Sequence, residues 1–366
     1  MSSPCILPSQ GAGGRTRHAW SKAAPLVRHR LQLAEYKLVE RFTTAPGEAV
    51  QLAADAVAAG AAAVLAVGGD GTIHEVVNGM MAQSQQEAPG VAPATALGVL
   101  PLGTGSDFIR TFGWKDNDVS TSCDRITSGK RQAIDVGRVI ISRCSHSTST
   151  SNSSRRVQQD AAGASSSAPA VSTEQHQQQG TAAEVKYFVN ICSCGVGATT
   201  PAIVNKLKWL RTLSYPVASV VALLKYKPLT VQVSCDGGPW KTVDQLTMLV
   251  VGNGVYWGGG MRVFPHASTC DGLMDAMVVQ RMGLLDFITK GHLLRSGDYN
   301  GVQNVTLLPP CKSLTIKPLT QAAGSAAAPL AAAPAGVPWW ELDGEGQGPC
   351  SNISIELLPS VLQLCV

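Results

Sequence analysis

An acidic residue lies inside a run of glycines in the first quarter of the chain. Residues 61–67 are continuously apolar, which is typical of a short buried parallel strand. The run 68–72, Gly-Gly-Asp-Gly-Thr, follows, and the apolar residues after it recur at helical spacing, so we expect a helix to begin near Thr72. Glycines at a strand-to-helix turn expose backbone N–H groups, which together with the helix N-terminus favour binding of a phosphate group.

The position of Asp70 within this loop points to a cation. A carboxylate repels phosphate unless a cation or a hydrogen-bond donor lies between them. Asp70 therefore indicates chemistry with a magnesium nucleotide rather than simple anion binding. The alternative is that Asp70 only caps a helix in a Gly-Asp-Gly turn.

Three further blocks carry residues of the same chemical kind. A second apolar run, 94–100, leads into 102–108, Leu-Gly-Thr-Gly-Ser-Asp-Phe, where a ligand would meet the end of a strand. The segment 252–275 contains Gly-Asn-Gly, three consecutive glycines and an Asp-Gly pair at Asp271. Near the C-terminus, Asp343 and Glu345 flank a single glycine.

In this order and spacing, the four blocks resemble the signature of the diacylglycerol kinase superfamily. That superfamily includes bacterial lipid kinases, sphingosine kinases and plant sphingoid long-chain-base kinases. Ser106 in the second block makes the chain most similar to the plant-type enzymes. A shorter form of the first glycine block also occurs in NAD kinases, so that block alone does not identify the substrate.

The resemblance implies a set of site residues and two cofactors, ATP and Mg²⁺. Asp343 would be the catalytic base, with Glu345 orienting it and Asp70 acting through Mg²⁺ and its waters. A structural Mg²⁺ would be held by Asp271 with the backbone carbonyls of Ser268 and Leu273. The residues implied in nucleotide binding are Thr43, Gly68, Gly69, Asp70, Gly71, Thr72, Glu75, Gly103 and Thr104.

Each of these assignments has a simpler structural alternative. Thr43 can be a plain N-cap. Asp271 can belong to a hairpin turn that binds no metal, and Asp343 can be a solvated turn aspartate. These alternatives remain open on the sequence alone.

The resemblance also predicts an α/β protein of two domains with the active site in the cleft between them. Residues 1–133 would form a Rossmann-like, phosphofructokinase-like nucleotide domain, to which residues 340–366 return. Residues 134–339 would form an antiparallel β-sandwich domain. The segments 144–184 and 321–338 lack apolar periodicity, and we expect them to be disordered insertions.

Composition limits the possible partners and the compartment. The net charge of +4 and the absence of a basic stripe argue against a nucleic-acid binder. The ten cysteines contain no CxxC pair, which favours free thiols in a reducing compartment. No apolar run is long enough to span a bilayer, so we expect a cytoplasmic or peripheral membrane protein. Residues 1–30 carry five basic and no acidic side chains, which leaves an organelle (mitochondrion or plastid) open.

The functional hypothesis is an ATP-dependent lipid kinase that works at a membrane surface. A sphingoid long-chain base is the first choice of substrate and diacylglycerol the second. NAD kinase and a non-catalytic lipid- or nucleotide-binding module are weaker alternatives. A homodimer is one assembly open to such a protein. The helix expected within 201–224 either covers the sheet or presents basic residues to lipid.

The insertion at 144–184 gives a first testable prediction. Its composition cannot bury enough apolar surface to fold, and closing a shorter loop costs less entropy. Replacing this segment with a short Gly/Ser turn should therefore preserve phosphoryl transfer and melting temperature. Loss of folding on replacement would show that the segment is structural.

Overall fold

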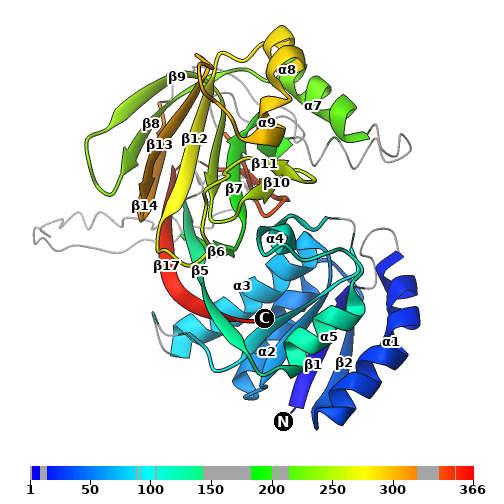
Figure 1. The fold of residues 1–366 in the computed structure, drawn as a ribbon. Coiled ribbons are helices and arrows are strands. Elements are labelled where there is room, and N and C mark those ends of the chain that lie inside the picture. The colour runs from blue at the N-terminus through cyan, green and yellow to red at the C-terminus, as the bar shows by residue number, and fades with distance from the viewer. Residues whose placement is uncertain are drawn as a thin grey trace, which may run out of the picture.

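The computed structural model describes residues 2–8, 15–87, 90, 92–103, 105–142, 183–199, 203, 214–319, 338–350 and 352–366. Figure 1 shows an α/β domain that holds both chain termini and a β-rich domain stacked on it. The two domains meet beside helices α3 and α4, where the predicted site lies. Thr104 and most of the segments 144–184 and 321–338 are outside the described residues.

Four parallel strands form the sheet of the first domain. Their order across the sheet is β2, β1, β3 and β4, and β3 pairs with β4 in register from Ala63 opposite Ala96 to Gly68 opposite Pro101. The four strands are β1 (Ser2–Pro8), β2 (Lys37–Thr43), β3 (Ala63–Gly68) and β4 (Ala96–Pro101). The glycine loops that follow β3 and β4 consequently lie side by side at one edge of the sheet.

Helices cover both faces of this sheet, which explains why β3 is apolar throughout. Val64 and Ala66 belong to the core formed with α2 and α3, whereas Leu65 and Val67 belong to the core formed with α1 and α5. The helices are α1 (Arg15–Leu33), α2 (Glu48–Ala58), α3 (Asp70–Glu87) and α5 (Val119–Thr127). The predicted Rossmann-like nucleotide domain is confirmed.

The second domain is built from two antiparallel layers and contains two clusters of buried apolar side chains. The long strand β9 pairs with β8 along its first half and with β7 and β12 along its second half, so it belongs to both layers. Trp340 and Phe188 are among the largest buried side chains of this domain. Its strands are β5 (Arg131–Ser142), β6 (Glu184–Phe188), β7 (Ile191–Gly195), β8 (Leu229–Cys235), β9 (Lys241–Gly252), β12 (Met274–Gln280), β13 (Val305–Cys311), β14 (Ser313–Pro318), β15 (Trp339–Leu342), β16 (Glu345–Pro349) and β17 (Asn352–Cys365).

Smaller elements complete the second domain. Helices α7 (Ser214–Lys225), α8 (Leu284–Lys290) and α9 (Leu293–Ser296) lie at the end far from the first domain in Figure 1. The hairpin of β10 (Tyr256–Trp257) and β11 (Met261–Arg262) lies nearer to α4.

Strand β17 connects the sheets of the two domains. It pairs antiparallel with β5 and β14, and its end pairs parallel with β4 through Leu364 opposite Leu97. Of the residues 340–366, which we expected to return to the first domain, those of β15 instead pair with β7 in the second domain. The return is made by the last residues of β17.

The stretch 187–194 does not form one continuous strand. The chain forms β6 up to Phe188, bends at Val189 and Asn190, and forms β7 from Ile191. Strand β6 pairs with β5, whereas β7 pairs with β9 and β15, so the chain changes partners at the bend. The bend leaves the backbone N–H groups of these residues available to a side chain.

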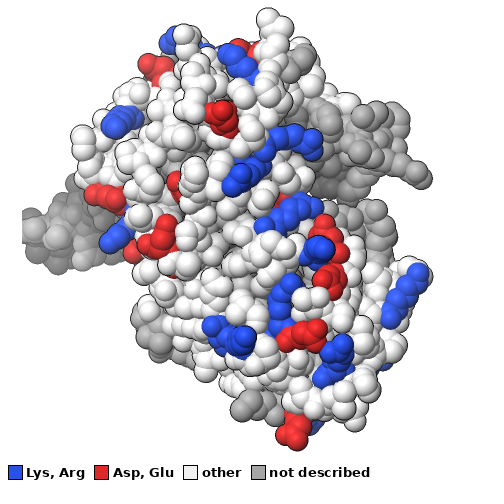
Figure 2. Space-filling view, in the orientation of Figure 1, with Lys and Arg blue, Asp and Glu red and all other residues white. Residues whose placement is uncertain are grey.

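The surface agrees with the mild net charge. On the face drawn in Figure 2, basic and acidic side chains are interspersed, most densely over the first domain near α4 and α5. Among the described residues, no helix is both long enough and apolar enough to cross a membrane.

The contact between α2 and α3 gives a prediction about stability. A Cβ atom at Gly79 would lie 2.0 Å from the carbonyl oxygen of Val50, so Gly79→Ala must push the two helices apart. We expect the free energy of unfolding to fall by about 1–3 kcal/mol, measured by urea denaturation. Gly346→Ala is the control, because a Cβ there meets nothing within 4 Å. Equal stability of both variants would contradict this account of the packing.

Candidate active site

Two glycine loops touch each other through their backbones at the ends of β3 and β4. A Cβ atom at Gly103 would lie 2.3 Å from the backbone nitrogen of Gly69, and one at Gly69 would lie 2.9 Å from the carbonyl oxygen of Gly105. A Cβ at Gly68 would lie 2.2 Å from Oγ1 of Thr72. Glycine is therefore required at these positions because the two loops leave no room for side chains.

Asp70 links the two loops. Helix α3 begins at Asp70, two residues before the expected start, and the carboxylate points to the second loop. Its oxygens accept hydrogen bonds from the backbone N–H groups of Asp107 (3.0 Å) and Phe108 (3.2 Å), which begin the short helix α4 (Asp107–Thr111). Burial, followed by repulsion from Asp107, raises the pKa of Asp70 to about 7.

Asp107 continues this network into the second domain. One oxygen of Asp107 accepts a hydrogen bond from Arg110 (2.7 Å), and the other accepts one from the backbone N–H of Gly259 (2.8 Å). The hydroxyl of Thr111 also accepts a hydrogen bond from the N–H of Val255 (3.1 Å). The second glycine loop is thus held against the β10–β11 hairpin.

The second domain contributes a tight turn to the site. Asp343 and Gly344 join β15 to β16 with φ angles of 50° and 87°, and Leu342 pairs with Glu345 across the hairpin. Two consecutive positive φ angles are typical of a type I′ turn, for which Asp-Gly is a preferred sequence. The solvated turn aspartate considered above is not what the fold contains, because the side chain of Asp343 is only 2% exposed.

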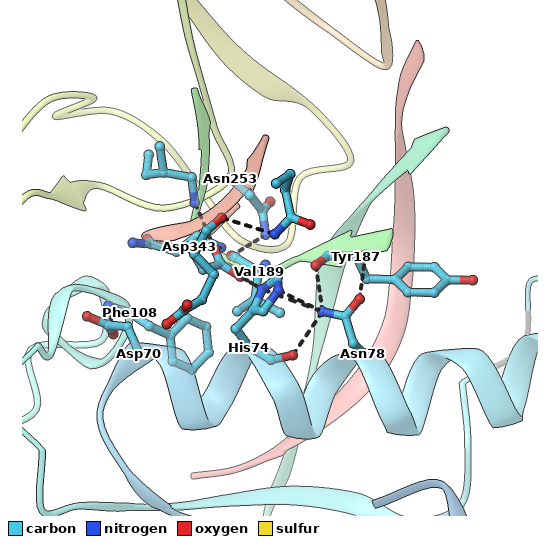
Figure 3. A network of polar contacts seen from close by, with 12 residues as sticks. Asp70, His74, Asn78, Phe108, Tyr187, Val189, Asn253 and Asp343 are labelled. Carbon is cyan, nitrogen blue, oxygen red and sulfur yellow. Dashed lines mark hydrogen bonds and ion pairs between the residues drawn. The ribbon is translucent and has the colours of Figure 1, made fainter. Parts of the chain in front are cut away.

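The buried carboxylate of Asp343 is surrounded by hydrogen-bond donors (Figure 3). One oxygen accepts from the N–H groups of Asn190 (2.9 Å) and Ile191 (3.0 Å). The other accepts from the N–H of Val189 (3.1 Å) and lies 3.1 Å from Nδ1 of His74. A carboxylate has about four acceptor positions, so these contacts occupy all of them.

Glu345 lies at the same turn but remains exposed. Its carboxylate covers the start of α3, since a Cβ at Gly71 would lie 2.5 Å from Glu345 Oε1. Partial loss of water raises the pKa of Glu345, and repulsion from Glu75 and Asp343 adds to the rise, whereas His74 opposes it. The acidic turn of one domain therefore rests directly on the first glycine loop, residues 68–72, of the other, which is the predicted phosphate loop.

Two of the residues predicted to bind nucleotide have structural contacts in this fold. The carboxylate of Glu75 accepts hydrogen bonds from the N–H groups of Gly47 (2.9 Å) and Ala49 (3.3 Å), so it caps α2. Thr43 is buried at the end of β2. Both lie at the same edge of the sheet as the glycine loops, whereas Thr104 is outside the described residues.

The predicted structural Mg²⁺ site stays a prediction. Oδ1 of Asp271 accepts a hydrogen bond from the N–H of Leu273 (3.0 Å), and the hydroxyl of Ser268 contacts Cys270. Repulsion from Asp271 helps to raise the pKa values of Asp135 and Asp275, after burial as the larger cause, and a cation would relieve this repulsion. Within the described part of the chain, no group of three or more His, Cys, Asp or Glu residues could hold a metal ion. The proposed ligands are one carboxylate and two carbonyls, which is a hard oxygen set that suits Mg²⁺.

Several residues of the site were missed at the level of sequence. Asp107 lies in the second glycine block and His74 lies just after the first, but neither was assigned a role, although His74 follows Asp70 by one helical turn. Glu341 is fully buried and accepts hydrogen bonds from Ser193 (2.8 Å) and from the indole N–H of Trp257 (2.9 Å). The available signal was its place next to the Asp343 turn, at the end of β15.

Comparisons with known proteins agree with this geometry. Residues 7–139 match the diacylglycerol kinase catalytic domain, and residues 190–366 match the YegS C-terminal NAD kinase beta sandwich-like domain. A diacylglycerol kinase of Bacillus subtilis is 25% identical over 291 residues, or 79% of this chain and 78% of that protein. A protein of Chromohalobacter salexigens named "Probable lipid kinase YegS-like" is 28% identical over 255 residues, or 69% of this chain and 64% of its own.

A solved structure supports the fold. The crystal structure of a diacylglycerol kinase from Bacillus anthracis matches with a TM-score of 0.59 at 16% identity, covering 100% of this chain and 96% of that one. The two matched domain models and these relatives identify a phosphotransferase with an α/β domain followed by a β-sandwich domain. The chain belongs to the superfamily of lipid kinases that carry the diacylglycerol kinase catalytic domain.

The buried Glu341 gives a prediction about stability and pH. Burial raises its pKa to about 7, above the value of about 4.3 for an unfolded glutamate, so its contribution to stability falls as pH rises through this window. Glutamine keeps the oxygen that accepts from Ser193 and Trp257 but does not ionise. We expect the advantage of Glu341→Gln over wild type to grow by roughly 2 kcal/mol between pH 5 and pH 8.

Urea denaturation at the two pH values measures this difference. Glu356→Gln is the control, because Glu356 is an exposed residue of β17. An advantage of Glu341→Gln that is independent of pH would mean that Glu341 does not titrate in this range.

Proposed function

We propose that this lipid kinase transfers the γ-phosphoryl group of ATP to the primary hydroxyl of a sphingoid long-chain base. The observation that carries the proposal is the position of Glu345, whose carboxylate lies against Gly71 at the start of α3. A proton acceptor from the second domain then faces the phosphate loop of the first domain. Phosphoryl transfer needs this placement more than it needs covalent chemistry by the protein.

The glycine loops fit the phosphates of ATP. Side chains are excluded at Gly69 and Gly103, so backbone N–H groups can approach the phosphates closely. The hydroxyl of Ser106 is buried and makes no hydrogen bond among the described residues, which leaves it available to the nucleotide. Mg²⁺, when bound, neutralises charge on the phosphoryl oxygens, and Asp70 at the junction of the loops would hold it directly or through water.

We assign the role of proton acceptor to Glu345, whereas the sequence had indicated Asp343 as the base and Glu345 as the residue that orients it. All four acceptor positions of Asp343 are occupied, so it has none for a substrate hydroxyl. Glu345 is exposed, and its raised pKa brings it closer to that of an efficient base at neutral pH. In this mechanism Glu345 takes the hydroxyl proton, and Asp343 fixes the turn that carries it.

The charge of the site supports a cationic acceptor. Asp70, Glu75 and Glu345 surround the start of α3, whereas the nearby guanidinium of Arg110 is already paired with Asp107 and Asp116. A surplus of carboxylates favours the ammonium group of a sphingoid base over a neutral headgroup. The lipid would be taken from a membrane surface by peripheral contact.

Diacylglycerol is the second candidate acceptor. The observation that favours it is the name of the Bacillus subtilis relative, which is a diacylglycerol kinase. Diacylglycerol also offers a primary hydroxyl but carries no positive charge. The two acceptors therefore differ in headgroup charge, and an acidic site attracts the positively charged acceptor more strongly.

Transfer of radiolabel from ATP to lipids in matched mixed micelles tests the proposal. We expect sphinganine to be phosphorylated faster than diacylglycerol, and Glu345→Gln to lower turnover on both lipids by about 10²–10⁴-fold, because it removes a proton acceptor. Glu356→Gln on β17 is the matched control and should behave as wild type.

Two results would change these assignments. Equal or faster transfer to diacylglycerol would replace the sphingoid base as substrate. Turnover of Glu345→Gln near that of wild type would remove Glu345 from proton transfer.

A further inference from the structure

We propose that His74 is a positioning residue that holds the Asp343-Gly344-Glu345 turn against the phosphate loop through its hydrogen bond to Asp343. The inference rests on the proposed function, in which Glu345 accepts the substrate proton. His74 acts through Asp343 and is not placed in contact with substrate. The evidence is the way in which one face of α3 binds the second domain.

Three polar residues follow this face of α3 at intervals of one turn. Asp70, His74 and Asn78 are each four residues apart, so their side chains lie along one side of the helix (Figure 3). The amide of Asn78 donates to the carbonyl of Tyr187 (2.9 Å), and its oxygen accepts from the N–H of Tyr187 (2.9 Å). This two-way contact fixes the middle of α3 to β6 of the second domain.

His74 makes the next contact towards the phosphate loop. Three of the four donors to Asp343 are backbone N–H groups of the bend between β6 and β7, within the second domain. The fourth is Nδ1 of His74, 3.1 Å away, from the first domain. The side chains of His74 and Asp343 are 8% and 2% exposed, so water cannot readily replace this hydrogen bond.

The donors also determine the tautomer of His74. Three N–H groups around Asp343 match an ionised carboxylate, which can only accept hydrogen bonds. Nδ1 of His74 must therefore carry a proton to complete the set. Asn78 packs against the imidazole ring. Its amide nitrogen donates to the backbone carbonyl of His74 (2.9 Å) and lies 3.4 Å from both ring nitrogens.

The turn couples the position of the Asp343 carboxylate to the position of Glu345. Asp343 and Gly344 form a two-residue type I′ turn, which leaves little freedom between the Asp343 carboxylate and the residue after Gly344. Glu345 reaches Gly71, three residues before His74 on the same helix. Among the contacts that the described residues make between the domains, the His74–Asp343 hydrogen bond is therefore the one that acts directly on the turn carrying Glu345.

Substitutions that place a hydrogen-bond donor at the position of only one ring nitrogen of His74 test this role. An asparagine amide can occupy the place of Nδ1 and still donate to Asp343, whereas a glutamine amide reaches beyond it, as Nε2 does. We expect His74→Ala and His74→Gln to lower kcat on the order of 10²-fold, and His74→Asn to stay within about threefold of wild type, because small misplacements of a reacting group are costly. KM for ATP should change little in all three variants.

The kinetic results can either support or overturn the positioning role of His74. Rescue by asparagine but not by glutamine supports positioning through Nδ1. A His74→Asn variant as defective as His74→Ala, or a His74→Ala variant as active as wild type, would overturn the proposal. Melting temperatures of the three variants show whether any loss of activity reflects unfolding.

Two measurements without substrate separate this inference from the lipid kinase mechanism. Nitrogen-15 NMR of the full chain should show a proton on Nδ1 of His74, and an Nδ1 that carries no proton would overturn the proposal. Hydrogen exchange at the amides of Val189, Asn190 and Ile191 should accelerate in His74→Ala and His74→Gln but not in His74→Asn. These results decide the role of His74 even if no lipid is phosphorylated.

Discussion

The carboxylate of Asp343 is buried where the two domains meet, and donors from both domains surround it. A buried carboxylate is tolerated only when hydrogen-bond donors satisfy it. Here the bend between β6 and β7 supplies three backbone N–H groups, and α3 supplies the imidazole of His74. Because the donors come from both domains, the hydrogen bonds to this carboxylate also help to hold the two domains together.

The same boundary gathers other carboxylates whose burial is unfavourable. Burial raises the pKa values of Asp70 and Glu341 to about 7, and each is also repelled by an acidic neighbour. Hydrogen bonds from α4, Ser193 and Trp257 offset part of this energy. An acidic centre of this kind is stabilised further by cations, and this physical reason underlies the proposal of a magnesium nucleotide and a cationic acceptor.

Structural and functional roles overlap in the glycine loops. Asp70 caps α4 and Glu75 caps α2, although both were expected to serve the nucleotide. The helices begin where the loops end, at the carboxyl ends of the strands. The N–H groups of the first helical turn have no partner within the helix, so an acidic side chain in a neighbouring loop can accept hydrogen bonds from them. A side chain fixed in this way is also well ordered for binding a ligand.

The α/β domain and its two glycine loops were predictable from local sequence patterns. Continuous apolar strands and glycines at strand-to-helix turns act locally, so Ala63–Gly68 and the loop at Gly103 could be identified without knowledge of distant contacts. The contacts of Asp343, Glu345 and His74, on which their proposed roles rest, come from the tertiary structure. The acceptor positions of Asp343 are filled by residues more than 150 positions away and by a helix of the other domain, and burial of this kind leaves no local pattern. The break between β6 and β7 has the same cause, because the change of strand partners at Asn190 depends on where β5, β9 and β15 lie in space.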